Sequence, residues 1–255
     1  MKDLVLERFE NRIIDMGLTI THIADDGLIH LTKDDISLQI SLDNVRKSYE
    51  DDRTFDHLDN LVASIHSYLM GVNIPDWEEC KKDVYLSLFP SDFDFGNYPN
   101  DAVTSEFNTY YVYFTNNQYV WIDHDQIKLW DITVDEFKLQ VRVNMKRLLS
   151  DSKVEIADVE GGKRLAYFVT EIEGLKSALL FAENLKEIVK PLLGWPVYCV
   201  LPVRDFCYLF SETDKDELIG SLGEVVLKEY DSSGYEITTE VLKISDEGIE
   251  SIWKY

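Results

Sequence analysis

The chain has 255 residues, of which 48 are acidic and 25 basic, so its formal net charge is −23. The acidic excess is general, because residues 1–130 carry 24 acidic and 10 basic side chains and residues 131–255 carry 24 and 15. Such a field repels phosphate backbones and anionic lipids, so we predict no nucleic-acid or membrane partner and allow a basic protein partner. No apolar run approaches the about 20 residues that span a bilayer, and the N-terminus is unlike a signal peptide, so we expect a cytoplasmic protein.

The first half is predicted to begin with a helix over residues 3–16, ended by Gly17. Three short strands should follow at 18–23, 28–32 and 36–42, with Asp25-Asp26-Gly27 turning the first hairpin. A second helix is predicted over 54–70, capped by Thr54, with an apolar stripe made of Leu58, Leu61, Val62, Ile65 and Leu69. Further strands are expected at 83–89, 109–114 and 119–123, separated by an acidic loop at 90–101 and by Asn116-Asn117.

The second half is predicted to alternate helices with strand pairs. Thr133 and Glu136 form a capping box, which predicts a helix over 133–150. Further helices are expected over 175–190, stopped by Pro191 and Gly194, and from Asp214 onward, with a stripe of Leu218, Leu222 and Val225. The strand pairs are expected at 153–159 with 164–172, 195–201 with 206–210, and 235–245 with 249–253.

This order predicts an α+β fold in which antiparallel β-hairpins alternate with helices that lie mainly on one side of each sheet. It divides the chain into an N-terminal half, 1–130, and a C-terminal half, 131–255. The two halves could be similar sub-domains, although no sequence identity supports a repeat.

The segment "GWPVYCVLPVRDFCYLF" (194–210) could be a reactive centre or a hairpin with charges at its tip. Cys199 and Cys207 lie in apolar runs, where a thiol behaves as a small hydrophobe, and no histidine is nearby in sequence to act as a base. Pro202 is expected to end the first strand, and the Asp205 carboxylate to bond the turn backbone. We therefore predict a hairpin, with Arg204 and Asp205 as its candidate binding residues.

The other residues that could form a catalytic or metal site are better explained by a structural role. His124 stands between Asp123 and Asp125, but no second histidine or cysteine lies at metal-ligand spacing. The three cysteines, Cys80 among them, are too few for a disulfide framework. No nucleotide-binding, hydrolase or metalloprotease motif is present, so we assign no catalytic residue, no metal site and no cofactor. Core packing or a protein interface best explains an aromatic set on two neighbouring strands, which comprises Tyr110, Tyr111, Tyr113, Tyr119 and Trp121.

Several blocks of this chain resemble the YtpQ-like family of uncharacterised bacterial proteins, a domain-of-unknown-function group. The blocks are "TYYVYFTNNQYVWID", "ITVDEFKLQVRVNMKRL", "PVYCVLPVRDFCYLF" with Pro202 and Asp205, and "VLKISDEGIESIW". The segment "VYLSLFP" (84–90) matches the family's Phe-Pro ending. A basic residue is usual just before that ending, and here Tyr85 or a neighbour stands in its place. The resemblance implies a cytoplasmic bacterial α+β protein and transfers no catalytic residue.

Two functional hypotheses follow. The first is a non-enzymatic protein-binding module, immunity-like or chaperone-like, whose acidic N-terminal half binds a basic protein. The second is a small-molecule-binding protein or enzyme with a site between the two halves. A pocket with converging polar groups favours the second, and a broad exposed acidic and aromatic face favours the first.

Overall fold

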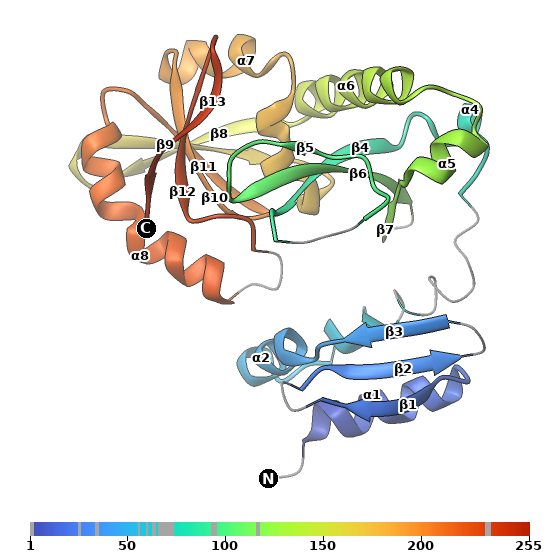
Figure 1. Cartoon of the computed structure of the whole chain (residues 1–255). Coiled ribbons are helices and arrows are strands. Elements are labelled where there is room, and N and C mark those ends of the chain that lie inside the picture. Colours follow the sequence, from blue (N-terminus) through green and yellow to red (C-terminus); the bar gives the residue numbers. More distant parts are fainter. Residues whose placement is uncertain are drawn as a thin grey trace. The chain divides into compact units, whose positions relative to one another are not determined.

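The computed structural model describes residues 3–24, 27–33, 36–55, 57–59, 61–62, 65, 74–92, 96–115, 118–232 and 236–255. These residues belong to two compact units, 1–73 and 74–255. Every strand pairing among the named strands is antiparallel, and helices are interspersed between them (Figure 1). The predicted α+β fold is therefore confirmed.

The described strands of the N-terminal unit form a three-stranded sheet, in the order β1-β2-β3. Helix α1 (Leu4–Asp15) precedes the strands β1 (Thr19–Ile23), β2 (Ile29–Lys33) and β3 (Ile36–Ile40). Asp3 caps α1 by accepting a hydrogen bond from the Leu6 amide, and the buried face of α1 consists of Val5, Phe9 and Ile13. These side chains form one apolar core with Ile29 and Leu31 of β2.

Helix α2 (Asp43–Asp52) was not predicted, because only Val45 is buried among its described side chains. The helix predicted over 54–70 is supported at Leu58, Val62 and Ile65, which are helical and buried. Residues 66–70, including Leu69, lie outside the described residues, as do Asp25 and Asp26 of the predicted turn.

The described residues of the unit 74–255 form two sheets. The first consists of β4 (Val84–Pro90), β5 (Asp101–Ala102), β6 (Phe107–Thr115) and β7 (Gln118–Trp121). Strand β4 lies on one side of β6, and β5 and β7 both pair with β6. Three helices belong to this region: α4 (Trp77–Cys80), α5 (His124–Leu129) and α6 (Val134–Asp151). Helix α6 packs on β4, where the Asn144 side-chain amide donates to the carbonyls of Lys81 and Val84, and it begins at the predicted Thr133–Glu136 capping box.

The second sheet has six strands in the order β13-β12-β10-β11-β9-β8. They are β8 (Lys153–Val159), β9 (Lys163–Val169), β10 (Val197–Val203), β11 (Phe206–Ser211), β12 (Glu240–Ser245) and β13 (Gly248–Lys254). The predicted hairpins at Gly161 and Gly248 are present, and both glycines have positive φ values.

Helices cover both faces of the six-stranded sheet rather than mainly one. Helix α8 (Lys215–Ser232) packs on β10 and β11 (Figure 1). It covers alternate side chains of β10 that include Tyr198 and Val200. The intervening residues of β10, such as Cys199 and Leu201, point into the other core, which also contains residues of α7 (Leu185–Leu193). Because successive side chains of a strand alternate between faces, this arrangement buries all of β10.

The compact units do not follow the predicted halves 1–130 and 131–255. One buried core contains side chains from both sides of that division, including Phe107 and Tyr111 of β6 and Phe137 and Met145 of α6. A boundary at 130/131 therefore passes through a single hydrophobic core, whereas the division after residue 73 separates two cores.

Three local predictions are corrected. Pro202 lies within β10, at an irregularity in its pairing with β11, rather than ending the strand. The helix predicted over 175–190 is two 3₁₀ segments, η2 (Glu173–Leu175) and η3 (Ser177–Phe181), followed by α7, which contains Pro191 and ends at Gly194. In α8 the third buried position is Val226, and Val225 is exposed. Within the described part of the chain, no helix is long and apolar enough to cross a bilayer.

Candidate functional site

Arg204 and Asp205 form the two-residue connection between β10 and β11, so the predicted hairpin is confirmed. Buried Ser177 of η3 holds this connection in place. The Ser177 amide donates to the Arg204 carbonyl at 2.9 Å, and its hydroxyl oxygen lies 2.7 Å from the Val203 carbonyl and 2.9 Å from the Phe206 carbonyl. The backbone of the turn is therefore fixed from outside the hairpin.

A cavity of about 450 Å³ lies beside this turn, and we call it the turn cavity. Three segments line it, namely the β6–β7 hairpin through Phe114 and Tyr119, the segment Glu171–Gly174, and the turn residues Arg204 and Asp205. Its volume falls within the range of small-ligand sites, about 300–1,000 Å³. The structure thus places both predicted binding residues on one cavity.

The Arg204 side chain is half-buried rather than exposed. Its guanidinium carbon lies 4.5 Å from the ring centroid of Phe89, and the Phe89 ring is itself 4.2 Å from that of Trp121. A guanidinium over an aromatic face is attracted by the ring quadrupole, which is worth about 0.5–2 kcal/mol. This contact orients Arg204 against the first sheet.

The Asp205 carboxylate does not cap the turn as predicted. Within the described residues it accepts no hydrogen bond and forms no ion pair, and the same is true of the Glu171 carboxylate. Glu173, the third carboxylate of the lining, pairs with Lys176. The turn cavity therefore presents two exposed carboxylates that form no ion pair with any described residue.

Aromatic rings also line the turn cavity. Phe114 and Tyr119 are half-buried, and their ring centroids lie 5.3 Å apart. The Tyr119 hydroxyl lies so close to Gly174 that a Cβ at this glycine would be 2.0 Å from the hydroxyl oxygen. A glycine at position 174 is thus required for this close approach.

The sequence did not identify Phe114, Tyr119 or Glu171 as site residues. They come from a hairpin and a loop that are remote in sequence from the Arg204–Asp205 turn. Apart from the Arg204–Asp205 turn itself, the aromatic set on β6 and β7 was the signal that touched this site, through Tyr119. Three of its members, Tyr110, Tyr111 and Tyr113, are buried in packing, as the core interpretation predicts.

The other candidate residues take structural positions. Cys199 and Cys207 are buried and unpaired, and burial raises the pKa of Cys207 to about 12 and that of Cys199 well above its ordinary value. Thiols held protonated in this way are poor nucleophiles. His124 begins α5 behind its cap Asp123, and no group of three metal-ligating side chains occurs among the described residues.

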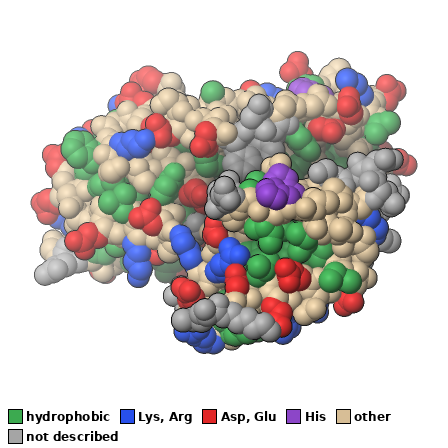
Figure 2. Space-filling view, turned by 60° about the horizontal axis from the view of Figure 1, so that its bottom comes forward, with side chains coloured by type: hydrophobic (Ala, Val, Ile, Leu, Met, Phe, Trp, Pro, Cys, Tyr) green, Lys and Arg blue, Asp and Glu red, His purple; other side chains and the backbone are tan. Residues whose placement is uncertain are grey.

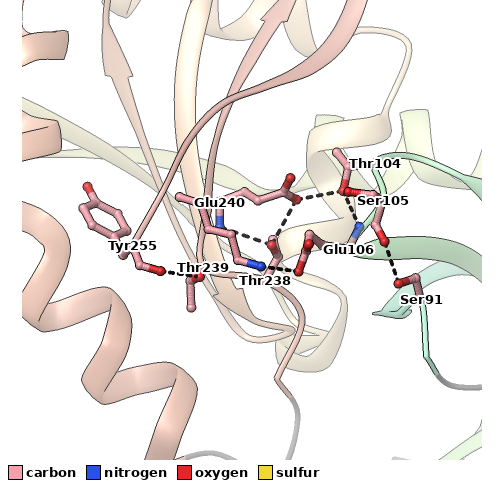
Figure 3. Close-up of polar contacts among 9 residues, drawn as sticks. Ser91, Thr104, Ser105, Glu106, Thr238, Thr239, Glu240 and Tyr255 are labelled. Atoms are coloured by element: carbon pink, nitrogen blue, oxygen red, sulfur yellow. Dashed lines mark hydrogen bonds and ion pairs between the residues drawn. The ribbon is translucent and has the colours of Figure 1, made fainter.

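A second polar cluster joins the loop after β5 to the start of β12 (Figure 3). Glu240, only 3% exposed, accepts hydrogen bonds from the Thr104 hydroxyl at 2.7 Å and the Thr238 hydroxyl at 3.0 Å. Nearby, Lys254 at the end of β13 pairs with Glu106 of the same loop. Since a buried carboxylate is costly unless it is hydrogen-bonded, this cluster fixes the β5–β6 loop against the six-stranded sheet.

No protein-family model, no curated protein and no solved structure gives a significant match to the chain. The resemblance to the YtpQ-like family therefore stays a prediction from the sequence blocks.

Proposed function

We propose that the protein is a non-enzymatic binding module for a basic protein and that the turn cavity receives a lysine or arginine side chain of that partner. The observation that supports this is a pair of carboxylates, Glu171 and Asp205, which lie beside aromatic rings and form no ion pair with any described residue. An immunity-like or chaperone-like role would use such a site. The proposed surface lies in the unit 74–255 rather than in the acidic N-terminal half.

The chemistry of the lining suits a cation. Its ionised side chains are three carboxylates, Glu171, Glu173 and Asp205, and one guanidinium, Arg204. An incoming ammonium or guanidinium can pair with the two carboxylates while its alkyl stem packs on Phe114 and Tyr119, as the stems of lysine and arginine do on apolar surface. An anion would instead meet the excess of negative charge.

The general charge of the chain would assist association without supplying specificity. On the face drawn in Figure 2, Asp and Glu side chains are scattered among hydrophobic and basic side chains rather than gathered in one patch. A net charge of −23 accelerates encounter with a basic partner over a long range. Specific recognition of one lysine or arginine side chain of the partner then requires a site of matching shape, and we propose that the turn cavity is this site.

The test uses a fluorescein-labelled oligolysine peptide and measures its binding by fluorescence anisotropy. The double variant Glu171→Gln/Asp205→Asn should weaken binding by about tenfold or more, which corresponds to 1.4 kcal/mol. The matched control is Asp158→Asn/Glu224→Gln, which changes the net charge equally at exposed positions away from the cavity. Equal weakening by both double variants would show that only the general charge matters and would contradict the proposal.

The natural partner is sought by affinity purification from the host, followed by mass spectrometry. The unmodified chain, the cavity double variant and the control double variant are used in parallel. A basic protein that is retained by the unmodified chain and the control, but not by the cavity variant, would support the proposal. A stoichiometric partner retained equally by all three would place the binding surface elsewhere.

A further inference from the structure

A second cavity, of about 560 Å³, lies between the first sheet, helix α6 and the turn that joins β12 to β13. We call it the β5 cavity, because Asp101, Ala102 and Val103 form one of its walls. The turn cavity has none of these lining residues. The two cavities are therefore separate candidate sites.

Apolar side chains form about half of the β5 cavity wall. Leu86 of β4, Val141 and Met145 of α6, Phe181 of η3 and Ile249 of β13 contribute hydrocarbon or aromatic surface. Burying an apolar group here gains about 25 cal/mol for each Å² removed from water. The body of a suitable ligand is therefore apolar.

The polar groups of the β5 cavity are largely engaged with one another. Lys138 of α6 donates to both carboxylate oxygens of Asp101 at 2.7 Å, and the Tyr111 hydroxyl donates to one of them at 2.8 Å. Burial acts to raise the pKa of Asp101, but hydrogen bonds from Lys138 and Tyr111 outweigh it and lower that pKa. The charge of Lys138 is thus compensated by Asp101.

Arg142 lies one helical turn after Lys138 and lines the same cavity. Within the described residues its guanidinium forms no ion pair, although its charge acts on Asp101 and Tyr111. Glu247, at the β12–β13 turn, is the other ionised group of the lining, and its carboxylate accepts the Ser245 hydroxyl at 2.7 Å. Arg142 is therefore the cation of this cavity that has no carboxylate partner among those residues.

We infer that the β5 cavity binds a small amphipathic carboxylate, whose apolar body lies on Leu86, Met145 and Phe181 and whose carboxylate pairs with Arg142. A guanidinium can bind a carboxylate through two parallel hydrogen bonds, which fixes the orientation of the head group. The Thr104–Glu240 contact supports this site indirectly, because it fixes the loop that carries Val103. The inference does not depend on the proposed binding of a basic protein.

The test uses octanoate as the probe, with octylamine and 1-octanol as ligands of the same chain length but different head groups. Calorimetric titration of the full chain should show saturable binding of octanoate and clearly weaker binding of the other two. Octanoate should also shift the methyl NMR signal of Met145, which reports occupancy of the cavity without any substitution. Equal binding of octanol, or an unchanged Met145 signal at saturation, would overturn the inference.

Three variants locate the head group. Arg142→Gln should weaken octanoate binding by about tenfold or more, and Lys146→Gln, one turn further along α6 and outside the cavity, should leave it unchanged. Glu247→Gln removes a negative charge from the lining and should tighten binding. Retained affinity in Arg142→Gln, or an equal loss in Lys146→Gln, would contradict the assigned role of Arg142.

Discussion

Gly174 and the Tyr119 hydroxyl are in such close contact that a methyl group at position 174 would overlap the phenol ring. The added Cβ would lie 2.0 Å from the hydroxyl oxygen and 2.9 Å from the carbon that bears it. This contact brings the segment Glu171–Gly174 against the β6–β7 hairpin, and both segments line the turn cavity.

We predict that Gly174→Ala destabilises the protein by about 1–3 kcal/mol, the usual cost of inserting a methyl group into a filled space. The matched control is Gly220→Ala in α8, where an added Cβ meets nothing within 4 Å. That substitution should stabilise the protein by about 0.5–1 kcal/mol, because alanine is the better helix former. Denaturant titration measures both, and the same sign of change in the two variants would contradict the close contact.

We predict that Arg204 contributes more to stability than Asp205, although the sequence assigned the turn-stabilising role to Asp205. Asp205→Ala should change the free energy of unfolding by less than about 0.5 kcal/mol, because the carboxylate has no hydrogen bond to lose within the described residues. Arg204→Ala should cost about 0.5–2 kcal/mol through the lost contact with Phe89. A larger loss for Asp205→Ala, measured by denaturant titration, would restore the turn-capping role predicted for it.

Two buried serines should respond oppositely to the same substitution. Ser177→Ala removes the hydroxyl that lies between the Val203 and Phe206 carbonyls, which should cost about 1–3 kcal/mol. Ser87 is equally buried, but its hydroxyl has no hydrogen-bond partner among the described residues. Ser87→Ala should therefore be neutral or stabilising, and a loss as large as that of Ser177→Ala would show that Ser87 has a partner after all.

Burial of Cys207 should make the stability fall at alkaline pH. Its pKa is about 12 in the folded chain, whereas an unfolded thiol ionises near about 8.5. Because the folded state holds this proton more tightly, the stabilisation is complete below about pH 8.5 and is lost as the pH rises towards 12.

The measurement compares the unmodified chain with Cys207→Ala by denaturant titration at about pH 7.5 and about pH 9.5. The free energy of unfolding should fall by about 1 kcal/mol more in the unmodified chain than in the variant. The cost of the smaller side chain is present at both pH values and cancels in this difference. An equal fall in both proteins would mean that Cys207 titrates normally and is accessible.

Much of the fold follows from local patterns. The Thr133–Glu136 capping box and the glycine turns at 161 and 248 are short-range signals, and each lies where it was predicted. Helix α2 lacks such signals, because it is mostly polar and ends at Arg53, a non-glycine residue with positive φ. Burial of Val45 against α1, β2 and other parts of the N-terminal core stabilises this helix, and such long-range contacts are invisible to local periodicity.

The candidate sites could be predicted less completely than the fold. Arg204 and Asp205 stood out because they are charged residues between two apolar strands. Their surroundings depend on pairs that are far apart in sequence, such as Arg204 with Phe89 and Gly174 with Tyr119. Arg142 gave no signal at all, since an exposed arginine on an amphipathic helix is ordinary and only the fold places it beside a cavity.

The hydrogen bond between Thr104 and Glu240 has a consequence for biosynthesis. Its two residues are 136 positions apart, so at 5–20 residues per second a ribosome makes Glu240 roughly 7–27 s after Thr104. During this interval the β5–β6 loop has neither Glu240 nor Lys254 to hold it. The nascent first sheet must therefore stay soluble without its final anchor, and this is the stage at which a cellular chaperone would have a substrate.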